Sequence, residues 1–423
     1  MKILWLTNIP LPEASFLMNE CPSSFGGWLT NTSKYLSDQK NCELAVAFPK
    51  NNIENNQTLH GERINHYAFP KIKSKARVSI DSNRYLKDIV EKVNPDLVHI
   101  FGTEFEHSLA MINVCSERGN DTVISIQGLV SVIGKHYKSN LPFGVQKRFT
   151  FRDFIKQDSI QQQQKKFVER GMFEIEAIKR AKHVIGRTTW DKACTSQINP
   201  DATYHFCNEI LREEFYNHEW KLDQCEKFSI FISQASYPIK GIHFVLEAMP
   251  LILKRFPQTK LYIAGHDITK VNTFKQKIKL SSYAKYVISL IKENNLESNV
   301  VFTGLLDEKK MCTRFLKTHV FVSSSTIENE SNSLSEAKIL GVPSIASYVG
   351  GVIDRVQHNF DGFHYQHDAP NLLAHYVCEI FENKDLAMRF SKNAREHALK
   401  THDRDVNTRK LIEIYEEITG KRG

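Results

Sequence analysis

The sequence contains no long hydrophobic run. No stretch approaches the ~20 consecutive apolar residues that a membrane-spanning helix needs. The apolar segment Met1–Leu6 is short and continues directly into a loop with prolines, which is typical of a first buried strand and not of a signal peptide. We therefore expect a globular protein of the cytoplasm.

Cysteine pairs and two common nucleotide motifs are missing as well. The eight cysteines are scattered without a C-x-x-C pair, so the sequence indicates neither a zinc site nor a disulfide framework. A G-x-G-x-x-G fingerprint and a G-x4-G-K-[ST] loop are absent, which argues against a dinucleotide-dependent oxidoreductase and a P-loop enzyme. We expect no bound metal, because side-chain cations and helix dipoles can hold a phosphate group.

What the chain does contain is the pattern of a large α/β protein. Its 423 residues, 41% of them hydrophobic and 25% charged, are too many for one ordinary core. Apolar strands alternate with helical patterns, which is typical of a parallel sheet covered on both faces. We predict two Rossmann-like, doubly wound domains over 1–208 and 228–402, with a linker over 209–227. The facing carboxyl-end edges of their sheets would form a cleft.

Residues 321–356 are the most informative stretch. An apolar strand is followed by a polar loop with Glu328, and then by a short predicted helix with Glu336 in its first turn. On one ideal helix, eight positions correspond to a turn of roughly 80°, so two such carboxylates would not share a face. The spacing makes sense if Glu328 lies in the loop and Glu336 on the helix. The alternative interpretation is a capping box from Ser333 to Glu336.

In this stretch the chain resembles the family-four retaining glycosyltransferases, which have the two-domain GT-B fold. The resemblance rests on the E-x7-E pattern of Glu328 and Glu336, with Glu-Ala at 336–337 and Gly-Val-Pro at 341–343. It is strongest over roughly residues 230–365 and weaker over the first half. It also implies that a last helix, over 403–423, packs back on the first domain.

The resemblance implies a donor site in the second domain. Backbone amides near Ser333 and Leu334 would hold the donor phosphate. Glu336 would accept hydrogen bonds from the ribose hydroxyls, and Glu328 would reach the donor sugar. Gly304, at the end of a predicted strand, lies where the family leaves room for the nucleobase.

A second motif, Ser236–Gly241, follows the first strand of the second domain. Lys240 directly precedes a glycine at a predicted helix start, an arrangement that suits a diphosphate, because the ammonium is a point charge and glycine admits the backbone. The resembled family places an arginine five residues before this lysine, where this chain has Ala235. In place of this arginine, Gln234 and Ser236 could supply neutral hydrogen-bond donors, or an arginine such as Arg187 could reach in from elsewhere.

The first domain offers further candidates. Gly26 and Gly27 open a predicted helix after the first strand, where a backbone can approach the donor closely. Arg187 follows a later strand and could bind a phosphate or an acceptor anion. The alternative for Arg187 is an ion pair with the following helix.

Polar residues near predicted strand ends are candidates for the acceptor side. His99 and Glu104 are candidate catalytic residues, although a histidine in such a position is more often structural. Gln127 stands where relatives often carry a histidine close to the reacting carbon, and we assign it, with His136, to acceptor binding.

The segment 135–170 is basic and aromatic. It carries nine Lys or Arg residues against three acidic ones. No RNP, zinc-finger or heptad pattern supports a nucleic-acid partner, so we expect none. A basic aromatic segment fits an anionic bilayer surface, here the inner face of the membrane, or a lipid phosphate. The alternative is a plain surface insertion.

Together these patterns predict a retaining glycosyltransferase. It would move a hexose or N-acetylhexosamine from a UDP-sugar, or alternatively a GDP-sugar, to a glycan or lipid-linked acceptor in envelope polysaccharide biosynthesis. The nucleotide-sugar is a co-substrate, and no other cofactor is expected; the pathway rests on the resemblance alone. The alternatives are a non-catalytic sugar-nucleotide-binding regulator, suggested by Ala235 and Gln127, and a GT-B epimerase or phosphorylase.

Overall fold

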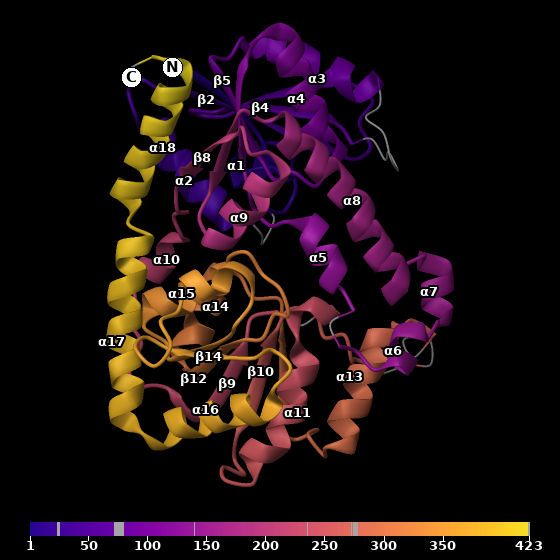
Figure 1. Ribbon diagram of the computed structural model, residues 1–423, viewed down its shortest axis with the longest axis vertical. Coiled ribbons are helices and arrows are strands. Elements are labelled where there is room, and N and C mark those ends of the chain that lie inside the picture. The colour runs from indigo at the N-terminus through magenta and orange to yellow at the C-terminus, as the bar shows by residue number, and fades with distance from the viewer. Residues whose placement is uncertain are drawn as a thin grey trace. The chain divides into compact units, whose positions relative to one another are not determined.

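The chain divides into two compact units, each built around one sheet (Figure 1). The computed structural model describes residues 1–22, 26–71, 80–138, 140–234, 236–271, 273 and 278–421. The first unit comprises Met1–Val132, Phe167–Arg212 and His402–Gly423, and the second comprises Ile133–Lys166 and Glu213–Thr401.

The first unit contains an eight-stranded sheet, parallel except at one edge where β3 runs antiparallel to β4. Its alternating apolar residues face both sides: in the first strand Ile3 and Trp5 join one core cluster, and Leu4 and Leu6 join the other. The strand order is β3 (Gln57–His60), β4 (Asn65–Pro70), β2 (Glu43–Lys50), β1 (Lys2–Leu6), β5 (Leu97–Phe101), β6 (Asp121–Ser125), β7 (His183–Gly186) and β8 (Thr203–Phe206).

Helices cover both faces of this sheet, so the unit is doubly wound. Apolar residues of α3 (Ile80–Val93), α4 (Glu106–Arg118), α8 (Ile160–Arg180) and α9 (Thr189–Ile198) pack on one face. Those of α2 (Gly27–Ser37) and α18 (Arg404–Thr419) pack on the other. The short helix α1 (Pro12–Leu17) and the first three residues of α5 (Val130–His136) complete the unit. The C-terminal helix α18 thus completes the core of the first unit, beside α2 (Figure 1).

A buried hydrogen-bond chain ties α18 to the sheet. The indole Nε1 of Trp5 donates to the hydroxyl oxygen of Tyr415 (3.1 Å), and this hydroxyl lies 2.5 Å from Nδ1 of His99. The other ring nitrogen of His99 lies 2.7 Å from Oγ of Ser125. Burial lowers the pKa of His99 to about 3, so the ring is neutral. The neutral ring accepts from Tyr415 and donates to Ser125.

The second unit contains a six-stranded parallel sheet. Its central strand β12 is buried along its whole length, as its run of Val and Phe predicts. The order is β11 (Val300–Gly304), β10 (Lys260–Ala264), β9 (Glu226–Ile232), β12 (Thr318–Ser323), β13 (Ser344–Ser347) and β14 (Phe363–Tyr365).

Helices of the second unit pack in pairs, α11 with α16 and α15 with α17. Their bounds are α10 (Glu213–Tyr216), α11 (Ile242–Leu253), α13 (Ser282–Glu293), α14 (Glu308–Leu316), α15 (Asn332–Leu340), α16 (Pro370–Glu382) and α17 (Lys384–Thr401). Two single-turn 3₁₀ helices, η1 (Pro238–Lys240) and η2 (Gly350–Asp354), follow the strands β9 and β13.

The segment 133–166 packs with the second unit although it interrupts the first along the chain. It carries the short helices α6 (Phe143–Lys147) and α7 (Phe151–Lys156), and α6 lies against α13. The predicted first domain, 1–208, did not separate this segment, because periodicity reports local structure and not the sheet on which a helix packs. Among the described residues, no helix combines the length and the apolar character needed to span a bilayer.

Replacing Tyr415 by phenylalanine tests the buried hydrogen bonds that join α18 to the sheet. The substitution keeps the ring and leaves the indole N–H of Trp5 and a ring nitrogen of His99 without their partner, so we expect a loss of about 1–3 kcal/mol of unfolding free energy. Hydrogen exchange of the amides in β1 and β5 measures it. Tyr348, which is exposed, is the control for the same change. Unchanged protection would mean that these buried hydrogen bonds contribute little to the unfolding free energy.

Candidate active site

The predicted residues Lys240 and Glu328 meet in the second unit. The ammonium of Lys240 lies 2.5 Å from Oε2 of Glu328, and the two side chains are 21% and 18% exposed. Oγ of Ser325 donates to the same carboxylate oxygen (3.2 Å). Burial opposes the charge of Lys240, but the Glu328 carboxylate outweighs it and raises the pKa of the lysine. The lysine is therefore charged at neutral pH, and both side chains remain partly exposed to solvent.

The turn η1 holds Lys240 against the end of strand β12. The hydroxyl of Ser324 donates to the carbonyl of Lys240 (2.7 Å), and the amide of Thr326 donates to the carbonyl of Ile239 (2.8 Å). Gly241, with a φ of 68°, then starts helix α11. Any side chain at Gly241 would overlap the carbonyl oxygen of Ser324, so this close approach of two loops requires glycine.

A second turn supports Glu328 from behind. The amide of Gly351 donates to the carbonyl of Glu328 (3.1 Å), and Gly350 has a φ of 49°. A Cβ at Gly350 would overlap this same carbonyl oxygen. The Gly350–Gly351 pair thus fixes the backbone of the loop that carries Glu328.

Helix α15 begins two residues earlier than a capping box at Ser333 requires. Its N-cap is Ser331, whose hydroxyl accepts from the amide of Leu334 (3.3 Å). The capping-box interpretation of Ser333 and Glu336 is therefore wrong. Glu336 lies in the second turn of α15, and it is buried. A helix pattern this short does not define its first residue, because several serines in the loop can act as the cap.

A buried polar network joins helix α15 to the rest of the second unit. Lys338, on α15, donates to Oδ2 of Asp361 (2.8 Å), and Nδ1 of His397 lies 2.6 Å from the same oxygen. Burial lowers the pKa of Lys338 to about 8, although Asp361 acts in the opposite direction. Nearby, the guanidinium of Arg355 pairs with Glu330 in the loop before the helix (2.6 Å). The Lys338 network thus holds the last turn of α15, and the Arg355–Glu330 pair holds the loop before its first turn.

The other predicted donor residues of the second unit lie near strand ends. Gly304 ends β11 with a φ of 77°, and nothing lies within 4 Å of a Cβ built on it. Ser236 is exposed and lines a pocket of about 400 Å³ with Tyr237 and His266. Ala235 lies outside the described residues.

In the first unit, Arg187 and Gln127 both contact Glu209. An ion pair joins the guanidinium of Arg187 to Glu209, and Nε2 of Gln127 donates to the same carboxylate (2.9 Å). The backbone amide of Arg187 also donates to Asp191 in helix α9 (3.1 Å). Both members of the ion pair are buried, so Arg187 is engaged within its own unit. Glu209, placed in the linker by the sequence, is the residue that brings this cluster together.

In the first unit, Gly26 and Gly27 lie at the start of helix α2, whereas the candidate His99 lies in the core. Gly26 caps α2 in the left-handed conformation, and the side chain of Arg212 lies over Gly27. His99 is a core residue of the first sheet through its contacts with Tyr415 and Ser125.

Glu104 and His136 are the two remaining acceptor-side candidates. Glu104 follows strand β5, and burial raises the pKa of its carboxyl against the opposing charge of Arg170. His136 is exposed at the end of α5, and belongs to the second unit. Partial burial and the neighbouring His367 lower its pKa.

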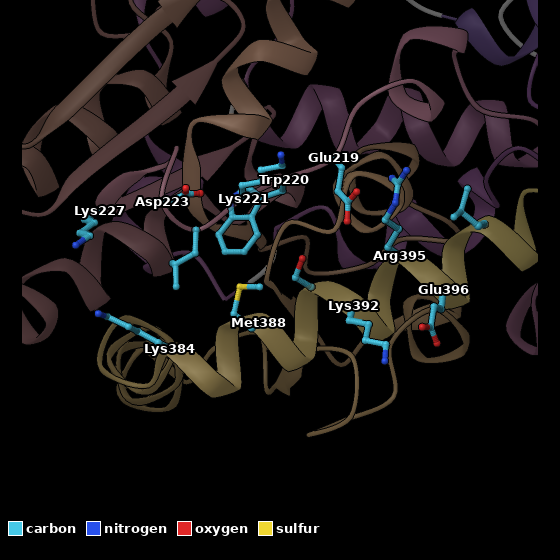
Figure 2. A pocket seen from close by; sticks show the side chains of 13 residues that line it. Glu219, Trp220, Lys221, Asp223, Lys227, Lys384, Met388, Lys392, Arg395 and Glu396 are labelled. Atoms are coloured by element: carbon cyan, nitrogen blue, oxygen red, sulfur yellow. The ribbon is translucent and has the colours of Figure 1, made fainter.

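A larger cavity, of about 750 Å³, lies elsewhere in the second unit (Figure 2). It is bordered by the chain around Trp220 and by helix α17, with Met388 on its apolar side and several lysines around it. It shares no residue with the Lys240–Glu328 pair, so we do not assign it to the active site.

Carboxylates near the C-terminus do not form a metal site. Asp403 and Asp405 make an Asp-x-Asp sequence, but Asp403 caps helix α18 by accepting from the amide of Val406 (2.8 Å). In the described ranges, no group of three His, Cys, Asp or Glu side chains is placed to hold a metal ion.

Two α/β units with parallel sheets define the GT-B fold class, as predicted. A sucrose-phosphate synthase from Thermosynechococcus elongatus is similar with a TM-score of 0.72 and 15% identity, over 99% of both chains. The HepE protein of Anabaena, solved with UDP and glucose, is similar with a TM-score of 0.67 and 16% identity, over 98% of this chain and 99% of that one.

Sequence comparison identifies the second unit more specifically. Residues 213–397 match the family model described as glycosyl transferases group 1. An uncharacterized glycosyltransferase of Methanocaldococcus jannaschii is 24% identical over 190 residues, which is 45% of this chain and 45% of the relative. The chain thus spans about half the length of the curated relatives it matches. The matched family segment contains both Lys240 and Glu328.

Replacing Gly350 by alanine tests the support behind Glu328. The new Cβ would overlap the carbonyl oxygen of Glu328, so the loop must move, at a cost of about 1–3 kcal/mol. We expect a lower thermal unfolding midpoint than that of the native chain. Gly119→Ala is the matched control, because Gly119 has a φ of 76° with nothing within 4 Å of its Cβ. If the two variants behave alike, the loop contact is unimportant.

Buried neutral histidines predict a loss of stability in acid. Burial lowers the pKa of His99 and His107 to about 3, whereas the unfolded chain binds these protons near pH 6.5. Stability is therefore complete above pH 6.5 and falls as the pH drops towards 3, by about 2 kcal/mol per histidine at about pH 5. Urea unfolding across this range measures it.

The control for this pH dependence is an exposed histidine. His107→Gln should reduce the slope of unfolding free energy against pH, whereas His375→Gln should not, because His375 is 56% exposed. A flat unfolding free energy between about pH 7 and 5 would contradict the prediction.

Proposed function

We propose that this protein is a retaining glycosyltransferase. It transfers a hexose or N-acetylhexosamine from a nucleotide-diphosphate sugar, with a UDP-sugar favoured, to a glycan or lipid-linked acceptor. The observation that carries the proposal is the Lys240–Glu328 pair, which lies at the carboxyl ends of β9 and β12 inside the segment that matches the glycosyl transferases group 1 model. Ligands of open α/β sheets bind at this edge.

Lys240 is suited to the leaving diphosphate. Its ammonium has three N–H donors, of which one is directed at Glu328, and its raised pKa keeps it charged. Negative charge grows on the diphosphate as the glycosidic bond breaks, so a fixed cation there stabilises the transition state more than the bound donor. A missing arginine at position 235 makes the chain more dependent on this one lysine.

Glu328 is suited to the sugar. Its carboxylate is held by Ser325 and by Lys240, and its other oxygen can accept hydrogen bonds from sugar hydroxyls. Helix α15 begins just beyond, and its N-terminal amides and dipole favour the phosphates. We infer that the loop carrying Glu328 selects and orients the donor sugar, and that Glu328 does not attack the sugar as a nucleophile.

The reaction we infer is a front-face displacement. The bond from the anomeric carbon to the diphosphate oxygen breaks, and the acceptor oxygen bonds to the anomeric carbon on the same face of the ring. The proton of the acceptor hydroxyl passes to the leaving phosphate oxygen. The chain's own residues bind, orient and neutralise charge, and no covalent enzyme intermediate is needed.

Nucleotide-sugar preference is tested by thermal unfolding of the full chain with UDP-, GDP- and ADP-sugars. A ligand present at about 100 times its dissociation constant adds about 2.7 kcal/mol of stability. We favour UDP because HepE, a protein of similar fold, was solved with UDP and glucose. Stabilisation by a GDP- or ADP-sugar alone would overturn that choice of base.

Two substitutions test the catalytic pair. Lys240→Ala should lower transfer from a UDP-sugar by about 100-fold or more, as removal of one transition-state donor does in other enzymes. Glu328→Gln should also lower transfer strongly, because it removes the negative charge that holds Lys240 in place. Release of the nucleotide and the anomeric configuration of the product are the measurements. Lys400→Ala and Glu379→Gln change exposed side chains of the same unit and are the matched controls.

The outcomes separate the proposal from its alternatives. Full turnover in both variants would refute it. Donor binding by the native chain without turnover, with every acceptor tested, would instead support the non-catalytic regulator. An inverted product would exclude the retaining mechanism and leave glycosyl transfer itself intact.

A further inference from the structure

The segment 133–166 is fixed to the second unit by one side only. Tyr137, Leu141 and Val145 are buried, and Oγ of Ser282 on helix α13 donates to the carbonyl of Val145 (2.9 Å). A capping box between Thr150 and Asp153 starts helix α7, and both residues are buried. These contacts hold the helices α6 and α7, which are labelled in Figure 1, against the second unit.

That outward surface is unusually apolar. Five large hydrophobic side chains are between 56% and 67% exposed within residues 143–155, namely Phe143, Phe149, Phe151, Phe154 and Ile155. Four of the seven exposed phenylalanines in the described part of the chain lie here, so the cluster is local. Such a patch normally marks an interaction site. We call these five residues the phenylalanine patch.

Positive charge surrounds the phenylalanine patch, whereas the negative charge is already paired. The segment 133–166 contains eight Lys or Arg residues and two aspartates. Asp158 pairs with Arg152 (2.7 Å), and Asp153 accepts from the backbone of Thr150 (2.9 Å). Lys147, Arg148 and Lys156 are exposed, and Lys147 lies 4.1 Å from the ring centre of Phe143.

We propose that the phenylalanine patch docks the protein on an anionic lipid bilayer. Phenyl and sec-butyl groups cannot form hydrogen bonds, so they favour hydrocarbon, while lysine and arginine side chains favour the phosphates directly above it. A bilayer surface offers these two environments in that order. The proposal does not depend on the glycosyltransferase function, because it rests on side chains outside the Lys240–Glu328 site.

Electrostatics and burial make separate contributions to this docking. Basic residues near the surface are attracted to anionic lipids within about one Debye length, so added salt weakens the attraction. The phenyl rings add a contribution that salt does not screen. Binding should therefore need both an anionic lipid and intact aromatic residues, which distinguishes it from simple adsorption of a protein with net charge +8.

The test is co-sedimentation of the full chain with vesicles. We expect binding to vesicles of phosphatidylcholine with phosphatidylglycerol, and little binding to phosphatidylcholine alone. The double variant Phe151→Ser, Phe154→Ser should weaken partitioning by about tenfold or more. Both rings are more than half exposed, so the fold should survive, which circular dichroism and an unchanged melting curve check.

Matched controls separate the patch from generic effects. Phe360→Ser removes a phenylalanine of the second unit that is 51% exposed and should leave binding unchanged. Lys147→Glu with Lys156→Glu should abolish the preference for anionic vesicles, whereas Lys400→Glu should not. In a second measurement, the added emission of Phe154→Trp should shift to shorter wavelength on contact with anionic vesicles.

Three results would overturn the proposal. The first is equal binding of native protein and the Phe151, Phe154 double variant to anionic vesicles, and the second is a Phe154→Trp emission that vesicles do not change. The third is binding to single-stranded RNA that needs the same phenylalanines while vesicles fail to compete, since aromatic and basic side chains also bind such strands. Donor-dependent stabilisation of these variants shows separately that the Lys240–Glu328 site is intact.

Discussion

The ion pair of Lys240 and Glu328 joins two loops that are far apart in the chain and adjacent in space. Strands β9 and β12 are parallel neighbours, so the segments that follow them leave the sheet at the same edge. Two glycines permit the contact: Gly241 lets one loop approach the carbonyl of Ser324, and Gly350 lets a turn pack behind Glu328. Each partner stabilises the charge of the other in a partly buried place, where either one alone would be costly.

Buried polar contacts hold the helix that follows the Glu328 loop and the residues just before it. Buried polar groups fix a position only when their hydrogen bonds are made. Below helix α15, Lys338, Asp361 and His397 form such a network, and Arg355 pairs with Glu330 beside it. Pre-positioned donors and charges need no rearrangement when a substrate develops charge, which is how an enzyme site gains most of its effect. The buried polar groups of the second unit thus support the loops at the carboxyl-end edge of its sheet.

The two units differ in how they use their polar residues. In the first unit, His99 connects Ser125 with Tyr415 of the last helix, and Arg187 is bound to Glu209. These groups hold together segments that are distant along the chain. The segment 133–166 has the opposite character, since it covers the second unit with one side and leaves apolar side chains in water on the other.

The sequence by itself indicated two α/β units and the two motifs that contain Lys240 and Glu328, because alternating apolar runs and glycine-bounded turns are local signals. The short strands β3 and β14, of four and three residues, depend on a neighbouring strand for their hydrogen bonds, which a local pattern does not show. Only the tertiary structure decided that Ser331 caps α15, that Glu209 engages Arg187, and that 133–166 belongs to the second unit. Each of these depends on which distant groups come within hydrogen-bonding or packing distance, and residue spacing along the chain does not contain that information.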